Sequence, residues 1–137
     1  MRKYFIVLAI FLASCVPSTY EELRVNNAGN LSFSSEMSAM DVWALVFNQY
    51  QQCLDSGFQF RTAQFEVAGT PDAIGQGVIS IILHGPFGED LMLAIDIRQV
   101  KESGTQVVVT RALDFAAWKR SAELVKEWVV NGSQECR

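Results

Sequence analysis

Apolar residues recur every three or four positions in two stretches of the chain, which is the spacing of an amphipathic helix. The first stretch begins after a capping box over Ser38–Asp41, with Asp in place of the usual Glu, and ends at Gly57. The second begins at Asp114 as the N-cap and ends at Asn131-Gly132. The apolar positions are Trp43, Val46, Phe47, Tyr50, Cys53 and Leu54 in the first helix, and Trp118, Ala122, Val125 and Val129 in the second.

Between these helices the pattern changes to alternation with a period of two, which predicts β-strands. The strands are expected over residues 58–67, 76–84, 91–98 and 106–111. The first strand changes phase, which predicts a β-bulge near residues 61–63. Short connections rich in Gly and Pro favour an antiparallel meander. The order α-β-β-β-β-α predicts one α+β domain, residues 36–137, with two layers: a four-stranded antiparallel meander and two helices on one of its faces.

The opposite face of this sheet is expected to be open, because both helices lie on one side. Three side chains there are more apolar than a solvent-facing sheet requires, and apolar patches often mark interfaces. The possible interaction face consists of Ile82, His84, Met92 and Val108. The alternatives are a sheet that tolerates exposed apolar side chains, or a face covered by residues 20–33.

The first 15 residues have the pattern of a secretory signal: a positive start, an apolar run over residues 4–12 and then small residues. The run is shorter than the ~20 residues that span a bilayer. Leu12-Ala13-Ser14-Cys15 resembles the lipobox of bacterial lipoproteins at every position. The resemblance implies removal of residues 1–14 and attachment of lipid to Cys15. Val16, where Asp would resemble an inner-membrane retention signal, favours the outer membrane, facing the periplasm. The alternative is a secreted protein with an incidental cysteine.

Residues 15–35 are predicted to be the lipidated cysteine and a flexible tether, because Pro, Ser, Thr, Asn and Gly dominate the segment. Cys53 and Cys136 then remain, and an oxidising compartment favours a disulfide between them. A four-strand meander places the C-terminal ends of the two helices at opposite ends of the sheet. The bond therefore requires residues 131–135 to run back along the first helix. The alternative is a buried Cys53 and a free Cys136.

Composition excludes several classes of protein. The 137 residues are 50% hydrophobic and 19% charged, which is typical of a folded domain. With 11 Lys and Arg against 15 Asp and Glu, the formal charge is −4, so we expect no nucleic-acid partner. His84 is the only histidine, and the chain has no zinc, P-loop or dinucleotide motif. We expect no catalytic residue, metal or cofactor.

Three hypotheses on function follow from these patterns. The first is a lipid-anchored accessory or binding protein of the bacterial cell envelope, which contacts an envelope protein partner. The second is an assembly chaperone similar to the pilotin lipoproteins that escort secretion-channel subunits, which would need a groove for a partner helix or strand. The third is an envelope enzyme or inhibitor: Ser56–Phe60 resembles the Ser-Gly-x-x-Tyr motif of envelope lysozyme inhibitors, with Phe60 in place of the tyrosine.

Overall fold

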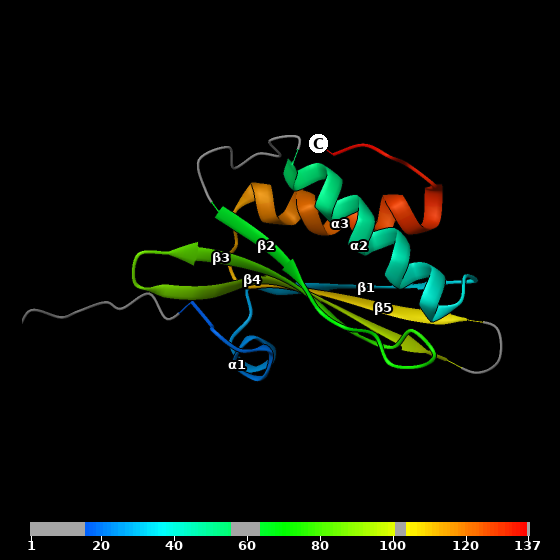
Figure 1. The fold of residues 1–137 in the computed structure, drawn as a ribbon, viewed down its shortest axis with the longest axis horizontal. Coiled ribbons are helices and arrows are strands. Elements are labelled where there is room, and N and C mark those ends of the chain that lie inside the picture. Colours follow the sequence, from blue (N-terminus) through cyan, green and yellow to red (C-terminus); the bar gives the residue numbers. More distant parts are fainter. Residues whose placement is uncertain (1–15, 56–63, 101–103, 137) are drawn as a thin grey trace, which may run out of the picture.

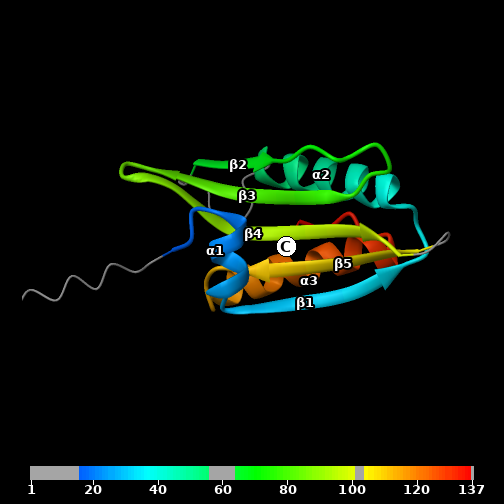
Figure 2. The same ribbon diagram turned by 90° about the horizontal axis from the view of Figure 1, so that it is seen from below.

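One antiparallel sheet separates two helices on one side from a short helix on the other (Figure 1). The computed structural model describes residues 16–55, 64–100 and 104–136. Its elements, in chain order, are α1 (Tyr20–Val25), β1 (Gly29–Ser35), α2 (Ala39–Asp55), β2 (Gln64–Ala68), β3 (Gly77–Gly85), β4 (Gly88–Gln99), β5 (Thr105–Arg111) and α3 (Ala116–Asn131). The sheet order is β1-β5-β4-β3-β2. The predicted α+β class is confirmed, with α2 and α3 on the same face (Figure 2).

The sheet has five strands, and the prediction of four is corrected by β1. This strand pairs with β5 from Gly29↔Arg111 to Ser35↔Thr105, and its Phe33 is 9% exposed in the core. The prediction that residues 15–35 form a flexible tether is therefore wrong for α1 and β1. Since β1 lies at one edge and the sheet continues through β4, β3 and β2, only the last four strands form the predicted meander.

The predicted positions of β3, β4 and β5 agree with the structure to within three residues at each end. β2 begins at Gln64, and the bulge expected near residues 61–63 lies outside the described residues. A register shift occurs elsewhere, between Ile81 and Ile82 of β3. Ile81 pairs with Leu93 and Ile82 with Leu91, so Met92 is an extra residue on β4. Such a bulge changes the face on which the following side chains lie.

Ser38 caps the start of α2 as predicted, although the Asp41 carboxylate binds the Ser38 hydroxyl and not its backbone N–H as in a full capping box. Ser38 Oγ accepts from the Asp41 backbone N–H at 3.2 Å and donates to the Asp41 carboxylate at 2.8 Å. The N-cap of α3 is Phe115, without a side-chain bond, rather than the predicted Asp114. Asp114 instead accepts from Lys119 and Arg111, and these bonds hold the pKa of its carboxyl below the ordinary value.

The core lies between the sheet and the two long helices, and its aromatic side chains come mainly from those helices. Trp43 and Trp118, predicted to be core residues, are 6% and 3% exposed. Trp128 is fully buried and meets Tyr50 edge to face, with ring centroids 5.0 Å apart. The Tyr50 hydroxyl lies 2.9 Å from Ser121 Oγ, and burial raises the pKa of this tyrosine.

A disulfide joins Cys53 in α2 to Cys136, with a Cα–Cα distance of 5.3 Å. The segment after α3 returns over the helical layer toward the end of α2, as the bond requires (Figure 1). Trp128 Nε1 donates to the Glu135 carbonyl at 2.6 Å, which fixes the returning segment against α3. The predicted pairing is thus present, and the returning segment is held against the second long helix, α3.

Candidate functional site

The sheet face opposite α2 and α3 is partly covered by α1. Leu23 of α1 is completely buried in a small cluster with Leu91 and Ala94, against which Val78 and Ile82 also pack. This covering was one of the alternatives raised by the sequence. The open apolar face is correspondingly smaller than the main prediction required.

The four residues predicted to form an interaction face do not form one surface. Met92 is 4% exposed and belongs to the core under the long helices, because the bulge turns it to that side; its prediction as an exposed residue is wrong. Ile82 packs against the α1 cluster. Val108 is half-buried opposite Asp96, and His84 lies near the end of β3.

Two side-chain hydrogen bonds fix the start of helix α1. Thr19 caps it by accepting from the Glu22 backbone N–H at 3.2 Å. The Tyr20 hydroxyl donates to Asp96 on β4 at 2.8 Å. Burial, and then the bond to this carboxylate, raise the pKa of Tyr20 to about 12. These contacts make α1 part of the domain.

His84 lies between two carboxylates. Its Nε2 is 2.6 Å from Glu66 on β2, and its Nδ1 is 3.2 Å from Glu89 on β4. A catalytic histidine pairs one nitrogen with a nucleophile and the other with an orienting carboxylate. Here both nitrogens face carboxylates, an arrangement that links three strands and does not activate a hydroxyl or thiol.

The β3–β4 hairpin ends in the two-residue loop Pro86-Phe87, closed by the pair Gly85↔Gly88. Phe87 is 100% exposed. β4 pairs with β5 only from Leu93 onward, so the outer part of the hairpin extends past β5 (Figure 2). The entering chain contacts the edge of β4 there: the Leu91 N–H donates to the Pro17 carbonyl at 2.8 Å.

The two edge strands of the sheet are β1 and β2, and β1 has the longer free edge. The Val100 N–H donates to the Gly104 carbonyl, and the Ala112 N–H donates to the Met92 carbonyl. In the β4–β5 register, the even-numbered residues of β5 therefore bond to β4. Because antiparallel bonds alternate along a strand, the residues between them bond to β1. In the β1–β5 register these partners are Gly29, Leu31, Phe33 and Ser35. The backbone N–H and C=O groups of Asn30, Ser32 and Ser34 therefore point to the free edge.

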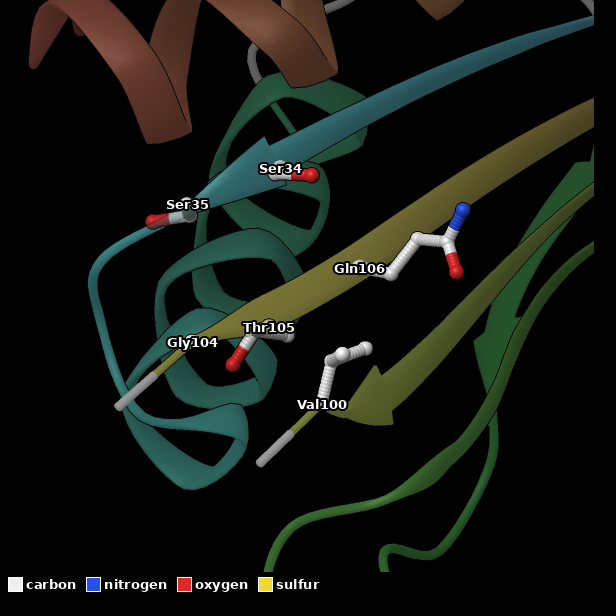
Figure 3. Close-up of a pocket in the computed structure, with 6 residues that line it drawn as sticks. All are labelled: Ser34, Ser35, Val100, Gly104, Thr105 and Gln106. Carbon is white, nitrogen blue, oxygen red and sulfur yellow. The ribbon is translucent and has the colours of Figure 1, made fainter. Parts of the chain in front are cut away.

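Two hollows lie at the end of this edge. One, of about 370 Å³, is lined by the six residues of Figure 3, from β1, the end of β4 and the start of β5. The other, of about 310 Å³, also includes Ser34 and Ser35 and continues toward α3. Thr105 at the first hollow donates its hydroxyl to the Met37 carbonyl at 2.7 Å, so that hydroxyl is used within the domain.

Within residues 16–55, 64–100 and 104–136, no group of three or more His, Cys, Asp or Glu side chains could hold a metal ion. No helix in these ranges is long and apolar enough to cross a membrane. Cys15 and the segment Ser56–Phe60, which resembles the lysozyme-inhibitor motif, lie outside these ranges.

No family model, no curated protein and no solved structure matches this chain. Function is therefore inferred from its N-terminal motif and from the geometry of the described residues.

The sequence contained a signal for α1 that the composition of the segment obscured. Thr19-Tyr20-Glu21-Glu22 has the spacing of a capping box, Thr followed three residues later by Glu. In β1, Leu31 and Phe33 alternate with Ser32 and Ser34, which is the pattern of a half-buried strand. The free edge of β1 thus follows from residues that had been interpreted as a linker.

Proposed function

We propose that this protein is a lipoprotein of the bacterial cell envelope, anchored by lipid on Cys15 in the outer membrane and facing the periplasm, where it binds a protein partner. The observation that carries the proposal is Leu12-Ala13-Ser14-Cys15, which follows a signal-like apolar run. The Cys53–Cys136 disulfide supports an oxidising compartment. Neither feature implies catalysis, and the two carboxylates around His84 give this histidine a structural role between strands.

The surface that best supports partner binding is the free edge of β1. It is seven residues long, GNLSFSS, without the charged or proline residues that usually protect an edge strand. β2, at the other edge, is five residues long and carries Glu66. An edge of this kind binds an extended segment by main-chain hydrogen bonds, while neighbouring hollows accept alternate side chains. We infer that the partner supplies a strand to β1.

An assembly role like that of the pilotins is the second candidate function, because it requires a site for a partner strand or helix. The β1 edge, with hollows of about 370 and 310 Å³ beside it, meets that requirement. The two candidates differ in the partner: an assembly chaperone would bind a subunit before its insertion, whereas an accessory protein would bind the assembled complex.

The anchor is tested with Cys15→Ala. The variant should accumulate as precursor and lose detergent-phase partitioning, and the mature wild type should carry the mass of its acyl groups. Normal processing and membrane retention of the variant would refute the anchor.

The binding edge is tested with a photocrosslinking residue at Ser32, compared with one at the exposed Ala44 of α2. Crosslinks to one envelope protein from position 32, and none from position 44, are expected. A second probe, placed at position 30, is combined with Ser32→Pro. This substitution should abolish the crosslink, because it removes an outward N–H. It should leave the melting temperature nearly unchanged, since edge strands tolerate proline at such positions. Ser32→Ala is the matched control and should retain the crosslink. Equal crosslinking from both positions, or retention in Ser32→Pro, would refute the edge.

A further inference from the structure

The tip of the β3–β4 hairpin exposes an aromatic ring, Phe87, to solvent. Phe87 is 100% exposed, and no atom lies within 4 Å of where a side chain on Gly88 would begin. Pro86 precedes it in the two-residue loop. Aromatic side chains that project from a protein in this way partition into the interfacial region of a bilayer, between headgroups and acyl chains.

The hairpin presents this ring on a braced stem. His84, next to the hairpin loop, contacts Glu66 at 2.6 Å and Glu89 at 3.2 Å. The contact with Glu66 ties the outer end of the hairpin to the neighbouring strand β2. A held tip loses little conformational freedom when it enters a membrane, in contrast to a mobile loop.

The chain enters the domain close to this tip. Pro17 is buried and its carbonyl accepts from the Leu91 N–H at 2.8 Å, while Val16 packs against the main core. Residue 15 precedes Val16 by one peptide unit, so their Cα atoms are ~3.8 Å apart. Along β4, the four residues from Leu91 to Phe87 span about 13 Å. An anchor at residue 15 thus holds the hairpin within reach of the membrane surface.

We propose that Phe87 inserts into the interfacial region of the leaflet that holds the lipid of Cys15, so that the hairpin end of the sheet faces the membrane. The proposal rests on the lipid anchor proposed above. Glu89 and Asp90 follow the tip, and the chain carries a net charge of −4, so insertion depends on the apolar ring and not on attraction to anionic headgroups. The start of β3 lies at the end of the strand opposite the hairpin loop (Figure 1). Ile74, which is exposed, is in the connection three residues before that start.

The test uses the full lipidated protein in vesicles of zwitterionic phospholipid, with and without brominated acyl chains, which quench nearby tryptophan. Phe87→Trp places a reporter at the tip, and Ile74→Trp, at a 55% exposed position, is the control at the opposite end. The native Trp43, Trp118 and Trp128 are buried and add a constant background. We expect brominated lipid to reduce the added emission of Trp at position 87 at least twofold and to leave that at position 74 unchanged.

Two outcomes would overturn the proposal: no quenching at position 87 in protein that is bound to vesicles, or equal quenching at both positions, which would mean that the domain lies flat. Failure of the anchor gives a different result, since the protein would then lack acyl mass and remain in the supernatant when vesicles are sedimented.

Phe87→Ser, lipidated and melting like the wild type, provides the second check. Its tip should become accessible to a water-soluble protease at least fivefold faster in vesicles, and an unchanged rate would also overturn the proposal.

Discussion

Replacing Leu23 with alanine tests whether α1 belongs to the folded domain. Leu23 is 0% exposed and is the only buried residue of α1, packed on Leu91 and Ala94. Leucine-to-alanine changes at buried sites cost about 2–5 kcal/mol, the larger values arising where the cavity cannot collapse. Because α1 has six residues and lies at the periphery, we expect partial collapse and a loss in the lower part of that range, about 2–3 kcal/mol.

The measurement is thermal and urea unfolding of residues 16–137, followed by circular dichroism. For a domain of this size, 1 kcal/mol shifts the melting temperature by about 3–5 °C, so Leu23→Ala should melt about 10 °C lower. Val25→Ala is the matched control, since Val25 is 79% exposed on the same helix and surface changes stay within about 0.5 kcal/mol. If Leu23→Ala melted within about 2 °C of the control, α1 would not unfold cooperatively with the sheet. Residues 16–28 would then behave as part of the tether predicted over residues 15–35.

Trp43→Ala and Trp118→Ala should each lower the free energy of unfolding by about 3–5 kcal/mol, because both rings are buried, and should unfold the domain or nearly so. If either variant melted within about two degrees of the wild type, that tryptophan would be a surface anchor instead. Cys136→Ser should lower stability by up to about 4.5 kcal/mol, the chain-entropy value for an 83-residue loop, measured by urea unfolding against the oxidised wild type. Stability should decline as the pH rises above about 10: the unfolded chain releases its tyrosine protons there, whereas folded Tyr20 retains its proton to a pKa of about 12. Burial raises the pKa of Tyr50 as well, so unfolding free energies from pH 9 to 12 should fall less steeply in Tyr50→Phe, and an identical slope would contradict this cause.

The two long helices and three of the strands were predictable because each buries one continuous side against the core. In α2 the apolar positions recur at helical spacing from Trp43 to Leu54, and in β4 Leu93, Ile95 and Ile97 alternate with more polar residues. These periods follow from the local chain alone. The disulfide was predictable from the cysteine count.

The open sheet face was harder to predict, because its composition depends on two non-local events. The extra residue at Met92 reverses the orientation of side chains on one side of the bulge, so that Leu91 faces α1 and Met92 faces the core. The covering helix α1 contributes one buried side chain, Leu23, which is too little for a periodic signal. Its capping box was the better indication. The β1 edge became visible only when the register with β5 was known.

The disulfide also has a consequence for the order of events during export. Under the export that we propose, Cys53 would leave the translocation channel 83 residues before Cys136, and β1 would leave long before its partner β5. In the envelope location that we propose, the Cys53 thiol would be exposed to an oxidising environment before Cys136 arrives. With the lipid on Cys15 that we propose, the thioether removes the only other thiol of the chain, and just one intramolecular pairing remains in place of three. Acylation at the N-terminus would then prevent mispairing as well as anchor the protein, and Cys15→Ala should accumulate Cys15-linked isomers, detectable by peptide mapping without reduction.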